Sequence, residues 1–454
     1  MRKLKKVLAL TLGVVMGLSI CACKGSVKES GKISDSKEEK KSSAESVESK
    51  TEMPKEKGET IYVYSWNQEL GERLIYFKEK YPQYADRVEF VNLGLEDDSD
   101  RYKTAMETLL QVGQDGTDKY PSIFAVDSDS ELEYVQSDYT VSMDTLGIGK
   151  TDMENMYSYT LDYTTFDGKV KALTWQAAPG CFLYRTDIAE AVLGTSDPEL
   201  VQEMISDWDK FLEVADKMKA AGYKMLSGSE DIKYAMLDQK EEPWVTDETL
   251  TIDPVISDYL ETSKRLYDGE YTNKTRMEDS DWLASFDDNV FGWFVTPEYI
   301  CEGIPAKEHM GEFNVCQGPA VYHQGGTYLN VAAECLDMSL AALVLKTLCC
   351  DEEVMAEVSQ EMGDFVNNKT VMQKLSDEGK TSLETLGGQN PVPIWMETAE
   401  KLDLSNASAY DERINAFLDK ASADYNAGLL ETTDEAVELV RKLVTEAYNY
   451  ITVE

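Results

Sequence analysis

The chain has 454 residues, 44 of them basic and 85 acidic, and its formal net charge is −41. Residues 1–22 carry +4 and residues 24–58 carry +1, so the chain from residue 59 onward carries about −46. This acidity excludes nucleic acid and anionic surfaces as partners and predicts a self-repelling, soluble monomer. The length from residue 59 onward suits two lobes better than one core.

The N-terminus is predicted to be an export signal spanning residues 1–22. Four basic residues, at positions 2, 3, 5 and 6, precede an apolar run at 7–20. A basic start followed by an apolar run of this length is typical of a signal peptide. The run is too short for a transmembrane span, which needs about 20 residues.

The signal ends in Ile20-Cys21-Ala22-Cys23. This segment resembles the bacterial lipobox, which has an aliphatic residue three positions before the cysteine and a small residue directly before it. Cys23 fits that pattern, whereas Cys21 does not, because Ile20 directly precedes it. Cys23 is therefore expected to carry the lipid anchor, and two acyl chains on it would hold the protein at a membrane. The alternative is an ordinary cleaved signal with two incidental cysteines.

Residues 24–58 have the composition of a tether. They contain nine Lys, eight Ser and seven Glu, and no aromatic residue. Such a segment cannot bury enough apolar surface to offset its ordering entropy, so it is predicted to be disordered. As a flexible coil it would span roughly 30–35 Å and let a folded body clear the membrane.

Beyond the tether, strands alternate with helices. Apolar and β-branched runs predict strands at 59–66, 88–93 and 122–126, and helical periodicity predicts helices at 68–80 and 101–112. The second helix is expected to carry Ala105, Leu109 and Val112 on one face. This alternation predicts an α/β fold whose parallel sheet is covered on both faces.

A second unit is predicted to begin near residue 169. Its expected strands are 170–174, 181–184, 224–226, 290–295, 312–317 and 327–332. Asp197-Pro198 and Asp207 are helix-start signals, and a further helix is expected at 254–267. The helix after Asp207 has an apolar stripe of Trp208, Phe211, Leu212, Ala215 and Met218. From residue 339 the chain is predicted to be mostly helical.

Signals for catalysis or a bound metal are scarce. The two histidines, His309 and His323, lie outside any HExxH motif, and no GxSxG motif is present. Six cysteines after residue 59 lack CxxC spacing and are predicted to be buried free thiols, although a disulfide stays open. The sequence therefore predicts no enzyme, no catalytic residue, no cofactor and no metal. Carboxylate pairs are so common here that a glycosidase is not excluded.

Residues 59–454 resemble the family-1 extracellular solute-binding proteins, the substrate-binding lipoproteins of carbohydrate ABC importers. The resemblance rests on the order of several blocks: IYVYSWN at 61–67, LTWQAAPG at 173–180, YR at 184–185, DIA at 187–189, SDWDKF at 206–211, NVCQGP at 314–319, GGTY at 325–328, DFVNN at 364–368 and GGQN at 387–390.

The resemblance implies a two-lobe, type II periplasmic-binding-protein-like fold with a hinge. Lobe 1 would comprise 59–172 and 322–378, and lobe 2 would comprise 176–320 and 380–454. A carbohydrate would bind between the lobes and pass to the transmembrane subunits of an ABC permease, at the extracellular face of the cell membrane. The lipid would be the only membrane contact. Two alternatives are a surface glycan-capture protein without a permease and a lipoprotein glycosidase.

The expected ligand-binding residues follow strands or stand at the crossovers between lobes. Aromatic rings would cover the apolar face of a sugar, and polar groups would bind its hydroxyls. They are Trp66, Asn67, Asp127, Asp129, Trp175, Gln176, Trp293, Glu298, Tyr299, Gln324, Gly325, Gly326, Thr327, Tyr328 and Trp395. Trp208 and Trp282 are expected in the core or on helix surfaces.

Two positions depart from the family pattern. Many relatives have Trp directly before Gly-Gly-Thr, where this chain has Gln324. Many also have Trp after the Thr-Pro of the second-lobe strand, where this chain has Glu298 and Tyr299. These changes favour a smaller or more polar ligand, or a sugar bound chiefly through its hydroxyls.

Overall fold

A computed structural model describes residues 53–95 and 98–453. The predicted signal, the predicted lipid site at Cys23 and most of the predicted tether lie outside these residues. Within them, no helix combines the length and the apolar character that crossing a bilayer requires.

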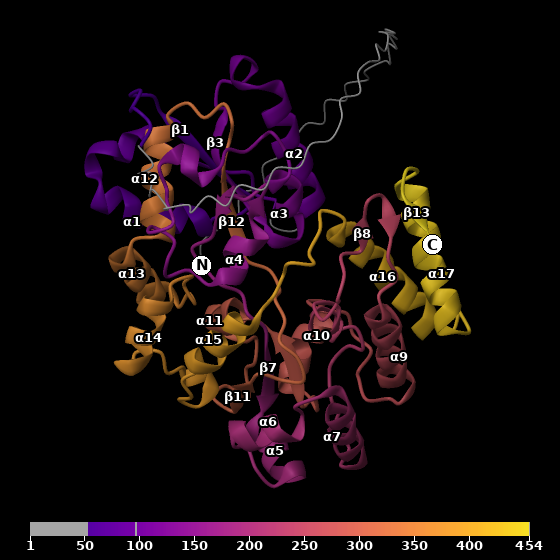
Figure 1. Cartoon of the computed structure of the whole chain (residues 1–454). Coiled ribbons are helices and arrows are strands. Elements are labelled where there is room, and N and C mark those ends of the chain that lie inside the picture. The colour runs from indigo at the N-terminus through magenta and orange to yellow at the C-terminus, as the bar shows by residue number, and fades with distance from the viewer. Residues whose placement is uncertain (1–52, 96–97, 454) are drawn as a thin grey trace, which may run out of the picture. The chain divides into compact units, whose positions relative to one another are not determined.

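The first sheet contains five strands in the order β2-β1-β3-β12-β6 (Figure 1). They span Val88–Asn92, Ile61–Ser65, Pro121–Asp127, Thr327–Val331 and Ala172–Leu173. Strands β1, β2 and β3 are parallel, as the sequence predicts, but β12 runs antiparallel to β3 and β6. The sheet is therefore mixed, because the chain enters β12 from the opposite direction when it returns from the second half of the fold.

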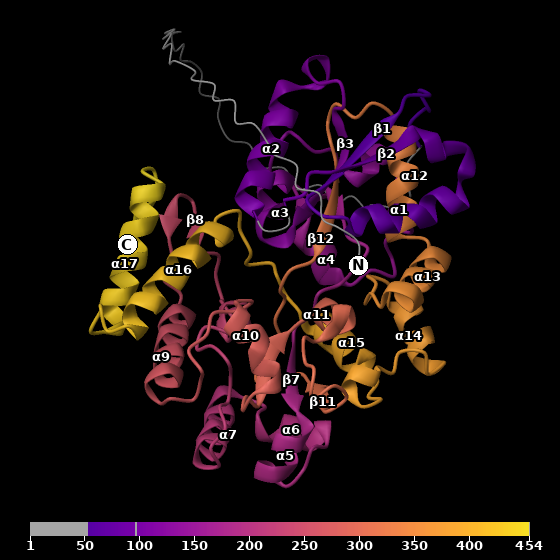
Figure 2. The ribbon, with the colours of Figure 1, turned by 180° about the vertical axis from the view of Figure 1, so that it is seen from behind.

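Both faces of the first sheet are covered, as expected. Ile61 and Val63 of β1 belong to one apolar cluster, and Tyr64 belongs to another on the opposite face, because successive strand residues point to opposite faces. Helices α1 (Glu69–Lys80) and α12 (Met338–Cys349) cover the first face and α2 (Ser99–Val112) covers the second. Figure 2 shows these helices around the same sheet from behind.

Helix α2 buries a different face from the one predicted. Tyr102, Met106 and Leu110 are its buried residues, whereas Val112 is 53% exposed. The Tyr102 hydroxyl donates to the Ala125 carbonyl at 2.8 Å. That bond satisfies the polar end of a large ring, so burying the tyrosine face covers more apolar area than burying the predicted face would.

The second sheet contains three antiparallel strands in the order β10-β7-β11, spanning Gly292–Val295, Cys181–Arg185 and Phe313–Cys316. Alternate β7 residues again serve two clusters, with Phe182 in one and Leu183 in the other. The Phe182 cluster includes residues of α7 (Trp208–Ala220), α9 (Pro254–Asp268), α16 (Asp411–Asn426) and α17 (Thr433–Ala447). The Leu183 cluster includes residues of α13 (Glu352–Met362), α14 (Lys369–Asp377) and α15 (Val392–Lys401).

Shorter elements complete the body. The remaining helices are α3 (Ser128–Val135), α4 (Ser158–Tyr163), α5 (Thr186–Leu193), α6 (Pro198–Met204), α8 (Lys233–Leu237), α10 (Ser280–Ala284) and α11 (Pro297–Gly303), with 3-10 helices at Pro82–Arg87, Gln114–Gly116, Met143–Leu146, Ser285–Asp287 and Glu384–Leu386. The remaining strands are β4 (Thr165–Phe166), β5 (Lys169–Val170), β8 (Val245–Thr246), β9 (Thr249–Leu250) and β13 (Thr452–Val453). In place of the expected strand at 224–226 there are only isolated bridges from Lys224 and Leu226.

Helix-start signals in the sequence are confirmed at the atomic level. Asp197 accepts bonds from the first-turn N–H groups of α6, and Asp207 accepts the Lys210 N–H at the start of α7. Met218 and Phe211 are buried on the predicted stripe of α7, and Trp208 packs partly buried at its edge. A capping carboxylate of this kind also interacts favourably with the positive end of the helix dipole.

The last residues of the predicted tether are attached to the first sheet's helices. The Lys57 and Gly58 N–H groups both donate to Asp337 at 2.9 Å, and Arg87 pairs with both Asp337 and Glu56. Residues 56–58 thus differ from the structureless end expected from composition, because a buried N-cap carboxylate offers them acceptors.

Of the six cysteines after residue 59, Cys181, Cys316, Cys335, Cys349 and Cys350 are free thiols in the structure. Cys181, Cys316, Cys335 and Cys349 are buried, and Cys301 and Cys350 are half-buried.

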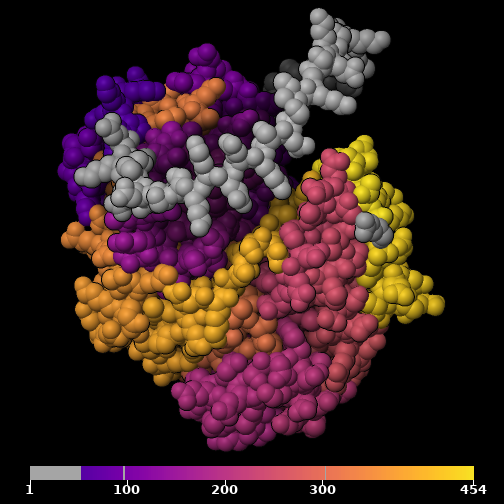
Figure 3. All heavy atoms as spheres, in the orientation of Figure 1, coloured from indigo at the N-terminus to yellow at the C-terminus, as the bar shows by residue number. Residues whose placement is uncertain are grey.

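Figure 3 shows late residues, in orange, among the indigo and purple atoms of the first sheet's segments. The chain therefore returns to the first sheet after building the second.

Candidate functional site

The candidate site lies where the parallel strands β1 and β3 end. Tyr64 of β1 pairs with Phe124 of β3, so both strands end at the same edge of the sheet. The half-buried Trp66 and Asn67 follow β1, and Asp127 ends β3. The structure thus brings these predicted residues to the edge where ligands of α/β sheets bind.

Polar side chains shape the turns at this edge. Asn67 Oδ1 accepts from the Glu69 N–H at 3.1 Å and from Ser65 Oγ at 3.3 Å, which directs the chain from β1 into α1. Asp127 Oδ1 accepts from the Asp129 N–H at 3.0 Å and caps α3. These bonds hold the two side chains in place at the mouth of the site.

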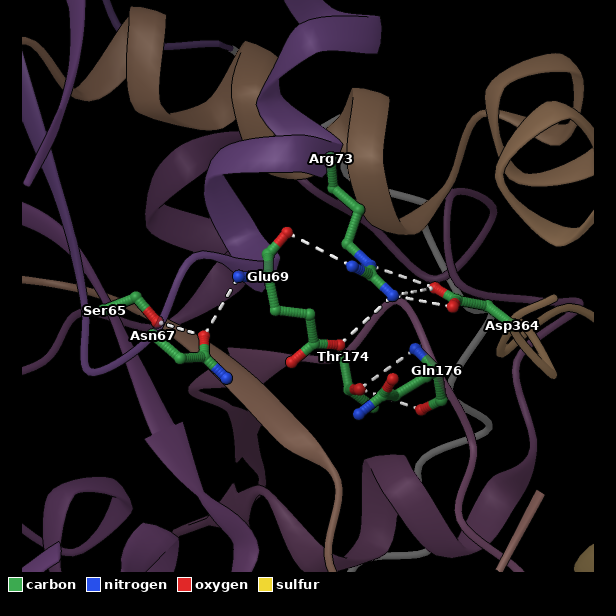
Figure 4. A network of polar contacts seen from close by, with 7 residues as sticks. All are labelled: Ser65, Asn67, Glu69, Arg73, Thr174, Gln176 and Asp364. Atoms are coloured by element: carbon green, nitrogen blue, oxygen red, sulfur yellow. Dashed lines mark hydrogen bonds and ion pairs between the residues drawn. The ribbon is translucent and has the colours of Figure 1, made fainter. Parts of the chain in front are cut away.

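A buried charge network lies beside Asn67 (Figure 4). Arg73 donates to both oxygens of Asp364 at 2.6–3.0 Å and lies 3.2 Å from Glu69. Burial alone would lower the pKa of Arg73, but the carboxylates of Asp364, Glu69 and Glu298 raise it. Glu298 stands on α11, so residues from both halves of the fold contribute charge to this network.

The two segments expected to cross between the lobes, at 173–180 and 314–328, run side by side where residues 178–180 meet residues 322–324. The Gly180 N–H donates to the Tyr322 carbonyl at 2.7 Å, and the Gln324 N–H donates to the Ala178 carbonyl at 3.3 Å. A Cβ on Gly180 would lie 2.0 Å from the Tyr322 ring, so only glycine permits this approach. The two segments are therefore held together by backbone hydrogen bonds.

Several buried polar atoms on predicted binding residues have no partner in the described part of the chain. Gln176 is buried, and its backbone is held by Thr174 Oγ1 at 2.8 and 3.2 Å (Figure 4). Its Nε2, the Tyr299 hydroxyl and Gln324 Oε1 have no hydrogen-bond partner among the described residues. Buried polar groups are normally bonded, so these atoms are available to a polar ligand.

Glycines shape the approach to β12. Gly325 and Gly326 have φ values of +71° and +99°, which L side chains rarely adopt. The Gly326 carbonyl accepts from the Ser128 N–H at 3.0 Å, and Thr327 pairs with Asp127 across β12 and β3. This loop thus closes the sheet edge directly beside the candidate site.

A pocket of about 60 Å³ lies next to this edge. Its walls include Asp129 and Tyr163 from the first part of the fold and Tyr234, Asp238 and His323 from later segments. The volume holds only a few water molecules. A ligand as large as a sugar ring therefore requires the walls to move apart.

Polar contacts join those walls. Lys103 Nζ and Ser130 Oγ each donate to Glu412 of α16 at 3.0 Å. The Tyr234 hydroxyl lies 3.4 Å from Asp129. These few bonds hold the pocket at its present width, and exposed or half-exposed contacts of this kind are weak individually.

Titratable groups in the pocket and at the neighbouring end of β3 have strongly shifted pKa values. Desolvation, aided by the Asp129 charge, raises the pKa of Asp127 to about 7, and desolvation raises the pKa of Asp238 to about 7. Burial lowers the pKa of His323 to about 4, so this ring is neutral at pH 7. Carboxyl groups near half-protonation can both donate to and accept from ligand hydroxyls.

Other predicted binding residues lie inside the apolar clusters. Trp175, Tyr328 and Trp395 are at most 2% exposed, and Arg73 lies 5.4 Å over the Trp175 ring. Trp293 is fully buried, stacks on Phe286 with centroids 4.3 Å apart, and donates from Nε1 to Ser285 Oγ at 2.9 Å. For Trp293 the expected ligand contact is replaced by a structural role, because its ring and its N–H are both occupied by protein.

Two late sequence blocks also have structural roles. Asn367 Oδ1 accepts the Tyr157 N–H at 3.0 Å, while Gln389 bonds both the N–H and the carbonyl of Val315 at 2.8 and 2.9 Å. Asn390 accepts the Val392 N–H at the start of α15. These amides link distant segments and do not face the pocket.

Residues 88–384, well over half of the chain, match the family model described as bacterial extracellular solute-binding protein. The chain belongs to this family. It is therefore a binding protein and not an enzyme. A comparison with curated protein sequences gave no significant match.

Solved structures show the same fold as this solute-binding protein. An extracellular solute-binding protein family 1 structure has a TM-score of 0.72 at 15% identity, covering 86% of this chain and 99% of its own. The sugar-binding protein MalE of Xanthomonas citri has 0.67 at 16%, with coverage of 86% and 99%. The galacto-N-biose-/lacto-N-biose I-binding protein of Bifidobacterium longum, in complex with lacto-N-biose, has 0.67 at 14%, with coverage of 87% and 98%.

Sequence reasoning missed several residues that line or support the site of this solute-binding protein. Tyr234 and Asp238 stand four residues apart, on one face of α8 and at its C-cap, a spacing that could have been noticed. His323 directly precedes Gln324, which the sequence had singled out. No local pattern marks Arg73, and the DFVNN block at 364–368 does not show the role of Asp364, because the two residues meet across 291 positions of the chain.

Proposed function

We propose that this solute-binding protein captures a carbohydrate between two lobes and delivers it to the membrane subunits of an ABC permease. The lobes would be 59–172 with 322–378 and 176–320 with 380–454. The observation that carries the proposal is that Trp66, Asn67 and Asp127 meet at the edge where β1 and β3 end, while Gln176, Tyr299 and Gln324 each carry a buried polar atom without a partner among the described residues. They suit the hydroxyl rim of a sugar. Structural neighbours described as sugar-binding support it.

Binding would follow opening of the 60 Å³ pocket. The contacts of Glu412 and Tyr234 would break in an open state and form again around the ligand. A ligand that bonds both walls stabilises the closed state by its differential affinity for that state. Asp127, Asp129, Glu298 and Thr327 would complete the site with Trp66 and Asn67.

Replacing Gln176 by alanine tests the site. The variant is expected to bind the cognate saccharide about tenfold more weakly, because the lost amide leaves ligand hydroxyls unpaired in a desolvated site. Melting temperatures with and without a panel of mono- and oligosaccharides first identify the ligand, and calorimetric titration then compares the variants. Gln373→Ala is the matched control, because Gln373 is an exposed residue of α14 whose side chain bonds Asp377 of the same helix. If no saccharide raises the melting temperature of the unmodified protein, the proposed function is wrong.

The proposed lipid anchor at Cys23 has its own test. Cys23→Ser is expected to remove the protein from membranes or to leave its signal uncleaved, because Cys21 directly follows Ile20 and so lacks the small residue that the lipobox has before its cysteine. Membrane fractionation and the mass of the mature N-terminus measure the outcome. Cys21→Ser serves as the control and should be processed normally. Retention of a normally processed Cys23→Ser protein would contradict the anchor.

A further inference from the structure

A second hollow lies beside the candidate site. It has a volume of about 620 Å³ and is bordered by α8, α9, α16 and the loop after β-bridge residue Thr272. Four cations line it, Lys233, Lys274, Arg276 and Lys420, against the two carboxylates Glu230 and Asp419. We call this hollow, with these six residues, the basic groove. Its excess of positive charge stands out on a body that carries about −46.

Two of the four cations form no ion pair with any described residue. Lys233 pairs with Asp419 at 3.0 Å and Lys420 with Asp424 at 2.9 Å. Lys274 and Arg276 form no ion pair within residues 53–95 and 98–453. Lys274 Nζ instead lies 3.8 Å from the centre of the Tyr267 ring. In so acidic a protein, carboxylates are abundant, so two adjacent unpaired cations at a hollow point to an anion from outside the chain.

The loop that carries these cations is fixed in place. The Asn273 N–H donates to the Ser227 carbonyl at 2.9 Å, and the hydroxyls of Ser227 and Thr275 lie 2.6 Å apart. A Cβ on Gly228 would lie 2.6 Å from the Thr275 carbonyl oxygen, so glycine is needed for this approach. A loop held at several points presents its charges without the ordering cost that a mobile loop would incur.

The basic groove is continuous with the candidate site. Tyr234 lines both the groove and the 60 Å³ pocket, and its hydroxyl lies 3.4 Å from Asp129. Met277, at the other end of the loop, accepts from Gln324 Nε2 at 3.4 Å. A molecule bound at the sheet edge can therefore extend past Tyr234 and Met277 into the groove.

We propose that the ligand is an acidic saccharide, whose carboxylate or sulfate group binds Lys274 and Arg276 while its neutral part occupies the candidate site. This inference rests on the proposed carbohydrate-binding function. The planar guanidinium of Arg276 can donate two parallel bonds to a carboxylate or sulfate, and Lys274 adds a point charge. Among the groove's own carboxylates, Asp419 pairs with Lys233, while burial raises the pKa of Glu230 and the charges of Arg276 and Lys233 oppose that rise.

Calorimetric titration of the mature protein with matched disaccharides tests the inference. Each pair has one neutral member and one member with a uronic acid or a sulfate ester in place of a neutral sugar. The acidic member should bind about tenfold more tightly or better, and about 0.5 M salt should reduce this advantage. The uronate and sulfate arms identify which anion the groove prefers.

Lys274→Ala/Arg276→Ala is the decisive variant, because both residues are exposed and neither forms an ion pair with a described residue. It should lose the advantage of the acidic ligand and keep its affinity for the neutral one. Lys442→Ala, at an exposed site on α17, is the control for a general change of charge. Equal binding of neutral and acidic saccharides, or an unchanged advantage in the double variant, overturns the inference and leaves the proposed function standing. Binding of no saccharide of either kind overturns both.

Discussion

Replacing Trp293 by alanine is expected to reduce the free energy of unfolding by about 3–5 kcal/mol. The ring is fully buried, stacked on Phe286 and edge-on to Phe313, so its removal leaves a large cavity beneath the second sheet. It also leaves Ser285 Oγ without the Trp293 N–H, which it now accepts at 2.9 Å. Denaturant melts of the ligand-free protein measure the loss.

The affinity of the folded Trp293→Ala protein for its ligand should stay within about twofold of the parent, because the ring makes no contact with the pocket. Trp66→Ala is the matched comparison. Trp66 is half-buried at the sheet edge and edge-on to Tyr102 at 5.4 Å, so its loss should weaken ligand binding more than it lowers stability. A Trp293→Ala protein that melts normally and fails to bind would restore Trp293 as a ligand contact.

Replacing Arg73 by leucine is expected to cost about 3–5 kcal/mol of stability, because it leaves buried carboxylates without their cation. The side chains of Arg73 and Asp364 are only 7% and 8% exposed, and that of Glu69 is 11% exposed. The double variant Arg73→Leu/Asp364→Leu should recover much of the loss, because it removes the stranded charge. Denaturant melts of the parent and the variants give the coupling between the two residues.

The Arg73→Leu penalty should depend on pH. Desolvation already raises the pKa of Asp364, and Arg73 opposes that rise, so the variant raises it further. The folded variant then holds a proton that the unfolded chain has lost, and its stability increases as pH falls toward the unfolded value. The melting temperature of the variant should therefore lie closer to that of the parent at pH 5 than at pH 8. A penalty that is constant across this range would mean that Asp364 stays ionised without Arg73.

Strands and helix starts could be predicted because their signals are local. The run that forms β1 and the carboxylates Asp197 and Asp207 act on neighbouring residues, so spacing along the chain is enough to identify them. The position of Trp66, Asn67 and Asp127 at one edge also follows from the sequence, because parallel strands end on the same side of a sheet.

Helix α2 and strand β12 show where this reasoning fails. The apolar periodicity of α2 is compatible with more than one buried face. The face with Tyr102 is the buried one because the Ala125 carbonyl of β3 accepts a hydrogen bond from the tyrosine hydroxyl. The antiparallel direction of β12 depended on where the chain returned from the second sheet. Neither the acceptor nor the direction of return is encoded in the residues of the element itself.

The sequence by itself determined the alternation of strands and helices, the family blocks and the sheet edge at which a ligand would bind. Only the tertiary structure decided which aromatic rings are occupied by protein, since Trp66 and Trp293 both stand near strand ends and differ in what packs on them. It also decided the charge pattern, by pairing Arg73 with Asp364 while Lys274 and Arg276 form no ion pair in the part of the chain that the structure describes. The physical reason is that burial and charge pairing depend on contacts between distant segments, which residue spacing along the chain does not specify.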